Sequence, residues 1–170
     1  MTNVRKITTR VINAIEVNPV TKTAKPIKIA LPDKGNVLEP FYKIIDCRLC
    51  EIVTLDSTLR VVIDEEGLLK HNHHYAFPGW GKSPLAGIGI IVGEDTNGDF
   101  VSVPDNLSSE RVERYIDFLG DDHGLEKAIK SGRVDRPSSS FATSLDPDAV
   151  RTTIWEWSPH DAPRVDETVH

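Results

Sequence analysis

The stretch Leu85-Ala86-Gly87-Ile88-Gly89-Ile90-Ile91-Val92 decides the fold of this chain. A short, continuous apolar run of this kind is typical of a strand buried on both faces of a sheet. Its glycines, Gly87 and Gly89, indicate a bulge or a close approach of another backbone. The segment 94–99 that follows contains an Asn-Gly pair, which favours a hairpin turn. We therefore expect residues 100–103 to return and pair with this strand.

Two more hairpins are predicted upstream of this strand. Residues 10–17 are rich in β-branched side chains and residues 26–31 alternate between apolar and polar, with a turn between them. Leu49–Leu55 and Leu59–Asp64 are a second pair of extended segments, joined by residues 56–58, which have turn chemistry. These segments together predict a mainly antiparallel sheet of about six strands.

Helical periodicity appears in three places. One helix is expected after the first hairpin, starting with the capping-box spacing of Asn36 and Glu39 and ending near Asp46. Apolar residues then recur at helical spacing over 112–119, before Gly120, and a shorter helix is expected between 122 and 132. The sequence therefore predicts an α+β fold with one helix after the first hairpin and two C-terminal helices.

We divide the chain into three parts on this basis. Residues 1–104 form an α+β core domain, residues 105–132 a helical extension packed on it, and residues 133–170 a loosely ordered acidic tail. Within the core, residues 68–84 are expected to be irregular, because prolines and glycines interrupt any regular element.

Composition describes an ordinary globular protein of 170 residues with a net charge of −6. No sequence segment has the pattern of a signal peptide or of a membrane span, so a reducing cytoplasm and no membrane partner are expected. The charge is uneven, since residues 1–34 carry +5 and the remaining segments, 35–103 and 104–170, carry −5 and −6. The unevenness has a plain explanation in solubility and internal attraction. The alternative is nucleic-acid or nucleotide binding by the basic N-terminal hairpin, through Arg5, Lys6, Arg10, Lys22, Lys25 and Lys28.

A Cys-x-x-Cys pair, Cys47 and Cys50, precedes a histidine-rich segment with His71 and His73. Two thiolates and two imidazoles are a ligand set that holds Zn²⁺, which gives the alternative of a small metal-dependent enzyme. Against it, Cys47 is expected to end a helix and Cys50 to lie inside a strand, so that the two side chains point in unrelated directions. A thioredoxin-like role is weaker still, because that motif opens a helix and does not close one. We therefore expect no metal and no cofactor.

The segment 71–80 is the strongest candidate for a binding site. Its imidazoles and aromatic rings are able to supply a general base and a stacking platform. It is also explained as a loop in which Asn72 caps its own backbone while Phe77 and Trp80 cover the end of the sheet, and of the two we favour this second interpretation. The candidate binding residues are His71, Asn72, His73, His74, Tyr75 and Trp80. No catalytic constellation is recognised elsewhere.

Four segments of the sequence, taken together, resemble one uncharacterised family, the domain of unknown function thirty-eight forty-six. They are the helix and Glu-Ile-Val strand of 41–53, the run Val61-Val62-Ile63-Asp64-Glu65-Glu66-Gly67-Leu68-Leu69, Asn72 with Ala76 after it, and the glycine-containing strand of 85–93. The likeness covers roughly residues 10–103 and leaves the tail outside. The resemblance implies a phage or other mobile-element setting, a bacterial host cytoplasm and an accessory role, and it carries over no catalytic residues. The family more often has small residues at the positions of Cys47 and Arg48, which argues against a shared metal site.

These observations favour a protein that acts by binding another protein, of host or phage origin, in a regulatory or anti-defence role. In the tail, Trp155 and Trp157 are large enough to anchor such a contact. Nucleic-acid binding and metal-dependent catalysis remain the alternatives.

Overall fold

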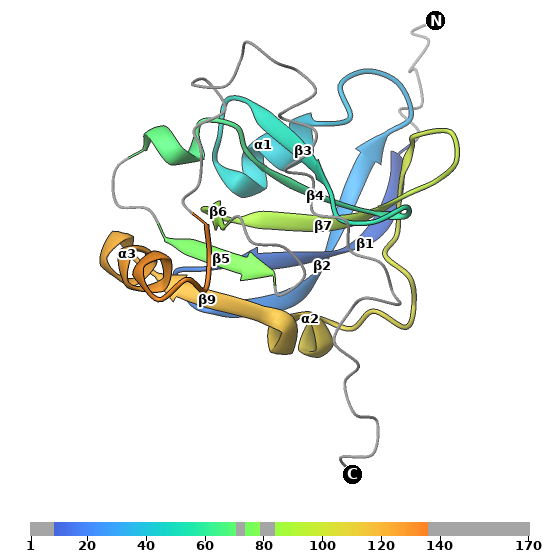
Figure 1. Cartoon of the computed structure of the whole chain (residues 1–170). Helices are drawn as coiled ribbons and strands as arrows, with labels where there is room; N and C mark the ends of the chain where they lie inside the picture. Colours follow the sequence, from blue (N-terminus) through green and yellow to red (C-terminus); the bar gives the residue numbers. More distant parts are fainter. Residues whose placement is uncertain (1–8, 71–73, 79–83, 136–170) are drawn as a thin grey trace, which may run out of the picture.

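Two antiparallel sheets and three α-helices make up the computed structural model, which describes residues 9–70, 74–78 and 84–135 (Figure 1). The larger sheet has the strand order β2-β1-β7-β4-β3, with β8 pairing to β7. The predicted α+β class with about six mainly antiparallel strands is confirmed. The strands are β1 (Thr9–Asn18), β2 (Thr23–Pro32), β3 (Cys50–Thr54), β4 (Leu59–Asp64), β7 (Gly89–Glu94) and β8 (Phe100–Val101).

Both upstream hairpins form as predicted, and local turn chemistry explains why. β1 and β2 pair along their whole length, and Asn18 Oδ1 accepts hydrogen bonds from the next turn residues. β3 pairs with β4 from Cys50 opposite Asp64 to Thr54 opposite Arg60.

The decisive strand, β7, lies between β1 and β4 and is buried on both faces, with Ile90, Ile91 and Val92 at most 2% exposed. At Gly89 the close neighbour is a side chain and not the predicted backbone, since an added Cβ would lie 3.0 Å from Val61 Cγ2 and 4.0 Å from Val62 O. The return of residues 100–103 is confirmed in place, although only Phe100–Val101 pair with β7, and Val103 N–H donates to Asn13 of β1 instead.

The helix α1 (Glu39–Ile45) covers one face of the larger sheet. Phe41 is fully buried and meets Phe100 edge to face, with ring centroids 5.4 Å apart. The helix ends at Asp46, as predicted, in a left-handed conformation. The capping box is wrong, because the cap is Leu38 and Asn36 Oδ1 accepts from the Leu38 N–H in a local turn.

A second sheet of three strands covers the other face, in the order β6-β5-β9. It consists of β5 (Tyr75–Pro78), β6 (Leu85–Ala86) and β9 (Ile116–Gly120). The prediction that 68–84 is irregular is wrong, since it contains the end of a 3-10 helix, η1 (Gly67–Leu69), and β5. The prediction of a helix through 119 is also wrong, because α2 (Ser109–Tyr115) ends where pairing with β5 turns the chain into a strand. Tertiary pairing outweighs the local helical period here.

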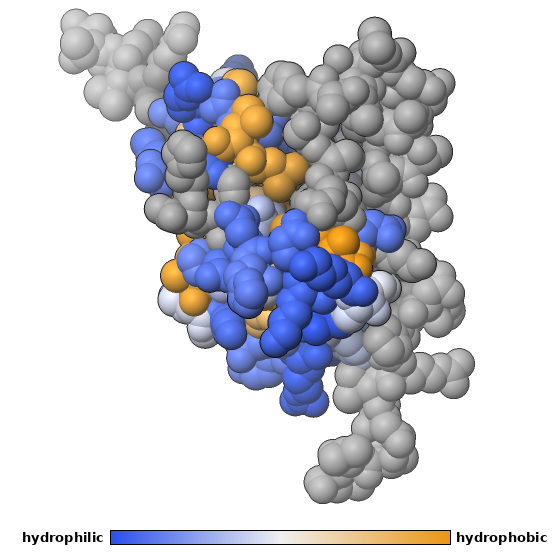
Figure 2. Space-filling view, turned by 60° about the vertical axis from the view of Figure 1, so that its left-hand side comes forward, coloured by the Kyte–Doolittle hydropathy of each residue, from blue (hydrophilic) through white to orange (hydrophobic). Residues whose placement is uncertain are grey.

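The last helix, α3 (Asp122–Lys130), packs on the second sheet. Its cap is Asp121, one residue earlier than predicted, and Asp121 Oδ1 accepts from Gly124 N–H. Val134, after the helix, is 3% exposed and packs with Leu125. Figure 2 brings this side forward and shows a mainly hydrophilic surface with smaller hydrophobic patches.

Candidate functional site

A groove of about 460 Å³ lies between the β1–β2 hairpin and the segment that leads into α2. The buried residues Ala14 and Ile15 line it from the hairpin, and Val103 and Leu107 line it from the segment that leads into α2. The chain reaches this position because Val103 N–H donates to Asn13 O at 2.9 Å and Ser102 Oγ accepts from Asn13 N–H at 2.9 Å. The lining residues are Asn13, Ala14, Ile15, Pro26, Ile27, Lys28, Val103, Pro104, Asp105, Leu107, Ser108, Ser109 and Glu110.

The rim of this groove carries charges of both signs. Lys28 lies on the hairpin side, opposite Asn13 in the β1–β2 register, while Asp105 and Glu110 lie on the side of α2. These three charged residues and Asn13 are all exposed. The groove therefore combines apolar lining residues with a polar rim that carries charges of both signs, which is the usual composition of a site for an organic ligand or a peptide.

The outer edge of β2, beside this groove, is closed to strand addition over much of its length. Glu113 of α2 accepts from Ala24 N–H through Oε2 at 2.9 Å, so Ala24 points its backbone N–H away from β1. Because alternate residues of a strand point their N–H groups to the same side, Pro26 and Pro32 also occupy outward positions, where proline has no N–H to offer. This edge is protected in the way that natural edge strands avoid unwanted pairing.

The described basic residues of the N-terminal hairpin are exposed but divided. Strand alternation places Lys25 and Lys28 on opposite faces of β2, and Lys25 lies opposite Glu16 of β1. Lys22 lies in the turn, and Arg10 is on β1. The structure does not gather these four charges on one surface, and nucleic-acid binding stays a prediction.

The two cysteines lie together, contrary to the expectation that they diverge. Cys47 Sγ and Cys50 Sγ are 3.4 Å apart, and both residues are partly exposed free thiols. They converge because the chain turns sharply at Asp46, whose φ is 59°, before β3 starts. Burial raises the pKa of both thiols, that of Cys50 to about 12, and the hydrogen bond between the two sulfur atoms partly offsets the rise at Cys47.

Charged side chains surround this thiol pair. Lys70 Nζ forms an ion pair with the buried carboxylate of Asp64, and this contact raises the pKa of Lys70. Arg48, between the cysteines, donates to both carboxylate oxygens of Glu66 at 3.0 Å. No group of three or more metal-ligating side chains is found among the described residues.

In the described part of the histidine-rich segment, Tyr75 connects the second sheet to α3. Tyr75 is 4% exposed, and its hydroxyl donates to Asp122 Oδ1 at 2.8 Å. The pKa of the Tyr75 hydroxyl is raised, mainly because the residue is buried and secondly because of this hydrogen bond. His74 is partly exposed, and its carbonyl accepts from Gly87 N–H at 2.9 Å.

The other predicted site residues lie outside the described residues. They are Arg5, Lys6, His71, Asn72, His73, Trp80, Trp155 and Trp157. Sequence reasoning missed the groove, because it depends on where 103–110 lies against a hairpin ninety residues earlier, and no local pattern marks that contact.

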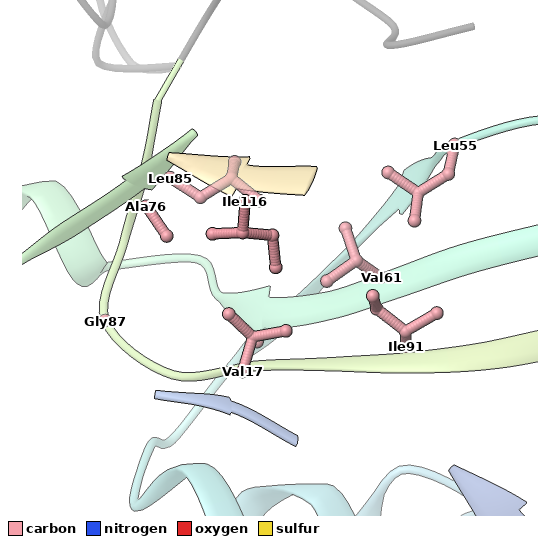
Figure 3. Close-up of a pocket in the computed structure, with 9 residues that line it drawn as sticks. Val17, Leu55, Val61, Ala76, Leu85, Gly87, Ile91 and Ile116 are labelled. Carbon is pink, nitrogen blue, oxygen red and sulfur yellow. The ribbon is translucent and has the colours of Figure 1, made fainter. Parts of the chain in front are cut away.

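A small cavity of about 20 Å³ lies between the two sheets (Figure 3). Side chains from both sheets point into it, among them Val17 and Ile91 from the larger sheet and Ile116 from β9. Its lining is almost entirely apolar, so it offers no polar group to hold a water or to orient a ligand. It is a packing gap of the core.

None of the described helices is both long and apolar enough to cross a membrane.

The fold and the groove define an α+β domain of two stacked antiparallel sheets with an open, mixed-charge groove at one edge. Residues 12–119 match the sequence model of the family described as domain of unknown function (DUF3846), and the chain belongs to this family. The match extends from β1 into β9 and so includes both sheets. No curated protein and no solved structure matches the chain significantly.

Proposed function

We propose that this protein is an accessory protein of a mobile genetic element that acts by binding another protein, and that the groove beside β1 and β2 receives a short extended segment of that partner. The observation that carries the proposal is the groove itself. Its volume of about 460 Å³ falls within the range of sites that hold small ligands or a few side chains.

The shape of the site favours binding on the face of the hairpin over extension of the sheet. Pro26, Pro32 and the Glu113 contact to Ala24 leave few outward N–H groups on β2 for a partner strand. A bound segment would place an apolar side chain against Ile15 and a carboxylate beside Lys28. A basic group on the same segment would face the acidic wall.

The test is a selection of random linear peptides displayed on phage, followed by calorimetry of the enriched peptides with the full chain. Lys28→Glu reverses the charge of the rim, and we expect it to weaken binding at least tenfold. Lys25→Glu is the matched control, because it makes the same charge change on the same strand but on the opposite face. We expect it to bind like the wild type.

Asn13→Trp provides a second variant, since Asn13 is exposed and a larger side chain there would fill the groove. The proposal fails if no peptide is enriched, or if the enriched peptides bind both groove variants as well as they bind the wild type. Equal loss with Lys25→Glu would point to general electrostatic attraction instead of the groove.

A further inference from the structure

The thiol pair at the end of α1 forms a site that the proposed binding function does not use. Cys47 and Cys50 are each other's partner in the structure, with 3.4 Å between the two sulfur atoms. A disulfide bond is about 2 Å long, so joining them requires the sulfur atoms to approach by a little over 1 Å.

The turn that carries the two cysteines is held in place at three points. Cys47 N–H donates to Tyr42 O at 3.1 Å, Leu49 O accepts from Glu65 N–H at 3.0 Å, and Arg48 grips Glu66 through both carboxylate oxygens. The proximity of the sulfur atoms is therefore built into the fold and does not depend on a loosely held loop. Preorganisation of this kind favours the ring closure that forms a disulfide over reaction with a second molecule.

We propose that Cys47 and Cys50 are a reversible modification site, in which an organic disulfide such as glutathione disulfide oxidises the pair to an intramolecular disulfide with Cys47 as the attacking thiol. In the first step the Cys47 thiolate attacks one sulfur of glutathione disulfide, and one glutathione leaves as a thiolate that takes a proton from water. In the second step the Cys50 thiolate attacks the Cys47 sulfur of the mixed disulfide and displaces the second glutathione. The protein loses two hydrogens and two electrons, and glutathione disulfide becomes two molecules of glutathione.

The order of the two thiols follows from their surroundings. The hydrogen bond between the two sulfur atoms, in which either can be the donor, lowers the pKa of Cys47 and raises that of Cys50, so it favours the thiolate at Cys47. Among the charges near Cys47, Lys70 favours the thiolate, whereas Asp64, with a larger effect, and Asp46 disfavour it. Because burial is the largest effect on both pKa values and holds each thiol largely protonated, the reaction is slow at neutral pH and accelerates with pH as the thiolate fraction grows.

The test uses the full chain, purified reduced and incubated with glutathione disulfide in the absence of oxygen, then acid-quenched for intact mass. We expect the wild type to lose two hydrogens and to carry no adduct. Cys47→Ser and Cys50→Ser are each other's controls, since each leaves one thiol without a resolving partner and is expected to retain one glutathione. Cys50→Ser should acquire its adduct several-fold faster than Cys47→Ser.

A second measurement works on the wild type alone. Trypsin cleaves after Arg48, between the two cysteines, so a disulfide joins peptide 44–48 to peptide 49–60 and dithiothreitol separates them. Stable glutathione adducts on the wild type, or thiols that remain free throughout, would overturn the proposal. So would zinc held by both thiols in the purified protein and released when they are alkylated, because the pair would then be a metal site.

Discussion

Replacement of Asp56 by alanine gives the sharpest test of how the β3–β4 hairpin is held. Asp56 is 6% exposed, and its Oδ1 accepts from Thr58 N–H at 2.6 Å, Leu59 N–H at 2.6 Å and Thr58 Oγ1 at 3.1 Å. The Leu59 residue is 2% exposed, so Asp56→Ala leaves its N–H buried without an acceptor. An orphaned buried donor costs about 1–3 kcal/mol, and the two weaker losses at Thr58 bring the total to about 2–4 kcal/mol.

The assay is urea denaturation followed by far-UV circular dichroism. For a slope of about 2 kcal/mol/M, in the middle of the usual range, this loss lowers the midpoint by roughly 1–2 M. Asp56→Asn keeps an oxygen acceptor and should cost only about 1 kcal/mol, the difference between charged and neutral hydrogen bonds. Ser57→Ala, in the exposed part of the same turn, should be within about 0.5 kcal/mol of the wild type. The reasoning is refuted if Asp56→Ala matches Ser57→Ala, or if Asp56→Asn is as damaging as Asp56→Ala.

Three further outcomes are expected. Phe41→Ala should lower the free energy of unfolding by about 3–5 kcal/mol in the same assay, because it empties a fully buried site against Phe100, whereas Phe41→Leu should cost much less. Burial raises the pKa of Glu51, so the ionised carboxylate destabilises the folded protein. Glu51→Gln should therefore be more stable than the wild type at pH 7. Urea titrations should show this advantage shrinking as the pH falls toward 4.5. Removal of residues 136–170 should leave the melting temperature in calorimetry unchanged, whereas a cut that also removes the buried Val134 should lower it.

The strands of the larger sheet could be predicted because each carries its own signal. β7 is a continuous apolar run because both of its faces are buried, and Asp56, a residue typical of turns, marks the turn between β3 and β4. The second sheet carries no such signal. β6 has two residues and β5 four. β6 pairs with β5, and β5 in turn pairs with β9, about forty residues further along the chain.

The candidate sites show the same division. The spacing of Cys47 and Cys50 is visible in the sequence. The convergence of their side chains depends on the left-handed turn at Asp46, which the alternation of strand residues does not predict. The groove depends on the contact of Val103 with Asn13, which is long-range and has no local pattern.

The groove and the thiol pair lie at opposite edges of one sheet, since the strand order runs from β2 and β1 through β7 and β4 to β3. Closing the disulfide changes the turn at 47–50, while the core of β7, with Ile90 fully buried, lies between the two sites. A close-packed core carries a small local shift only where it has a second arrangement to adopt. The two sites should therefore act independently, so that a groove-binding peptide has the same affinity for the reduced and the oxidised protein. A difference of tenfold or more in calorimetry would contradict this and would mean that oxidation regulates binding across the sheet.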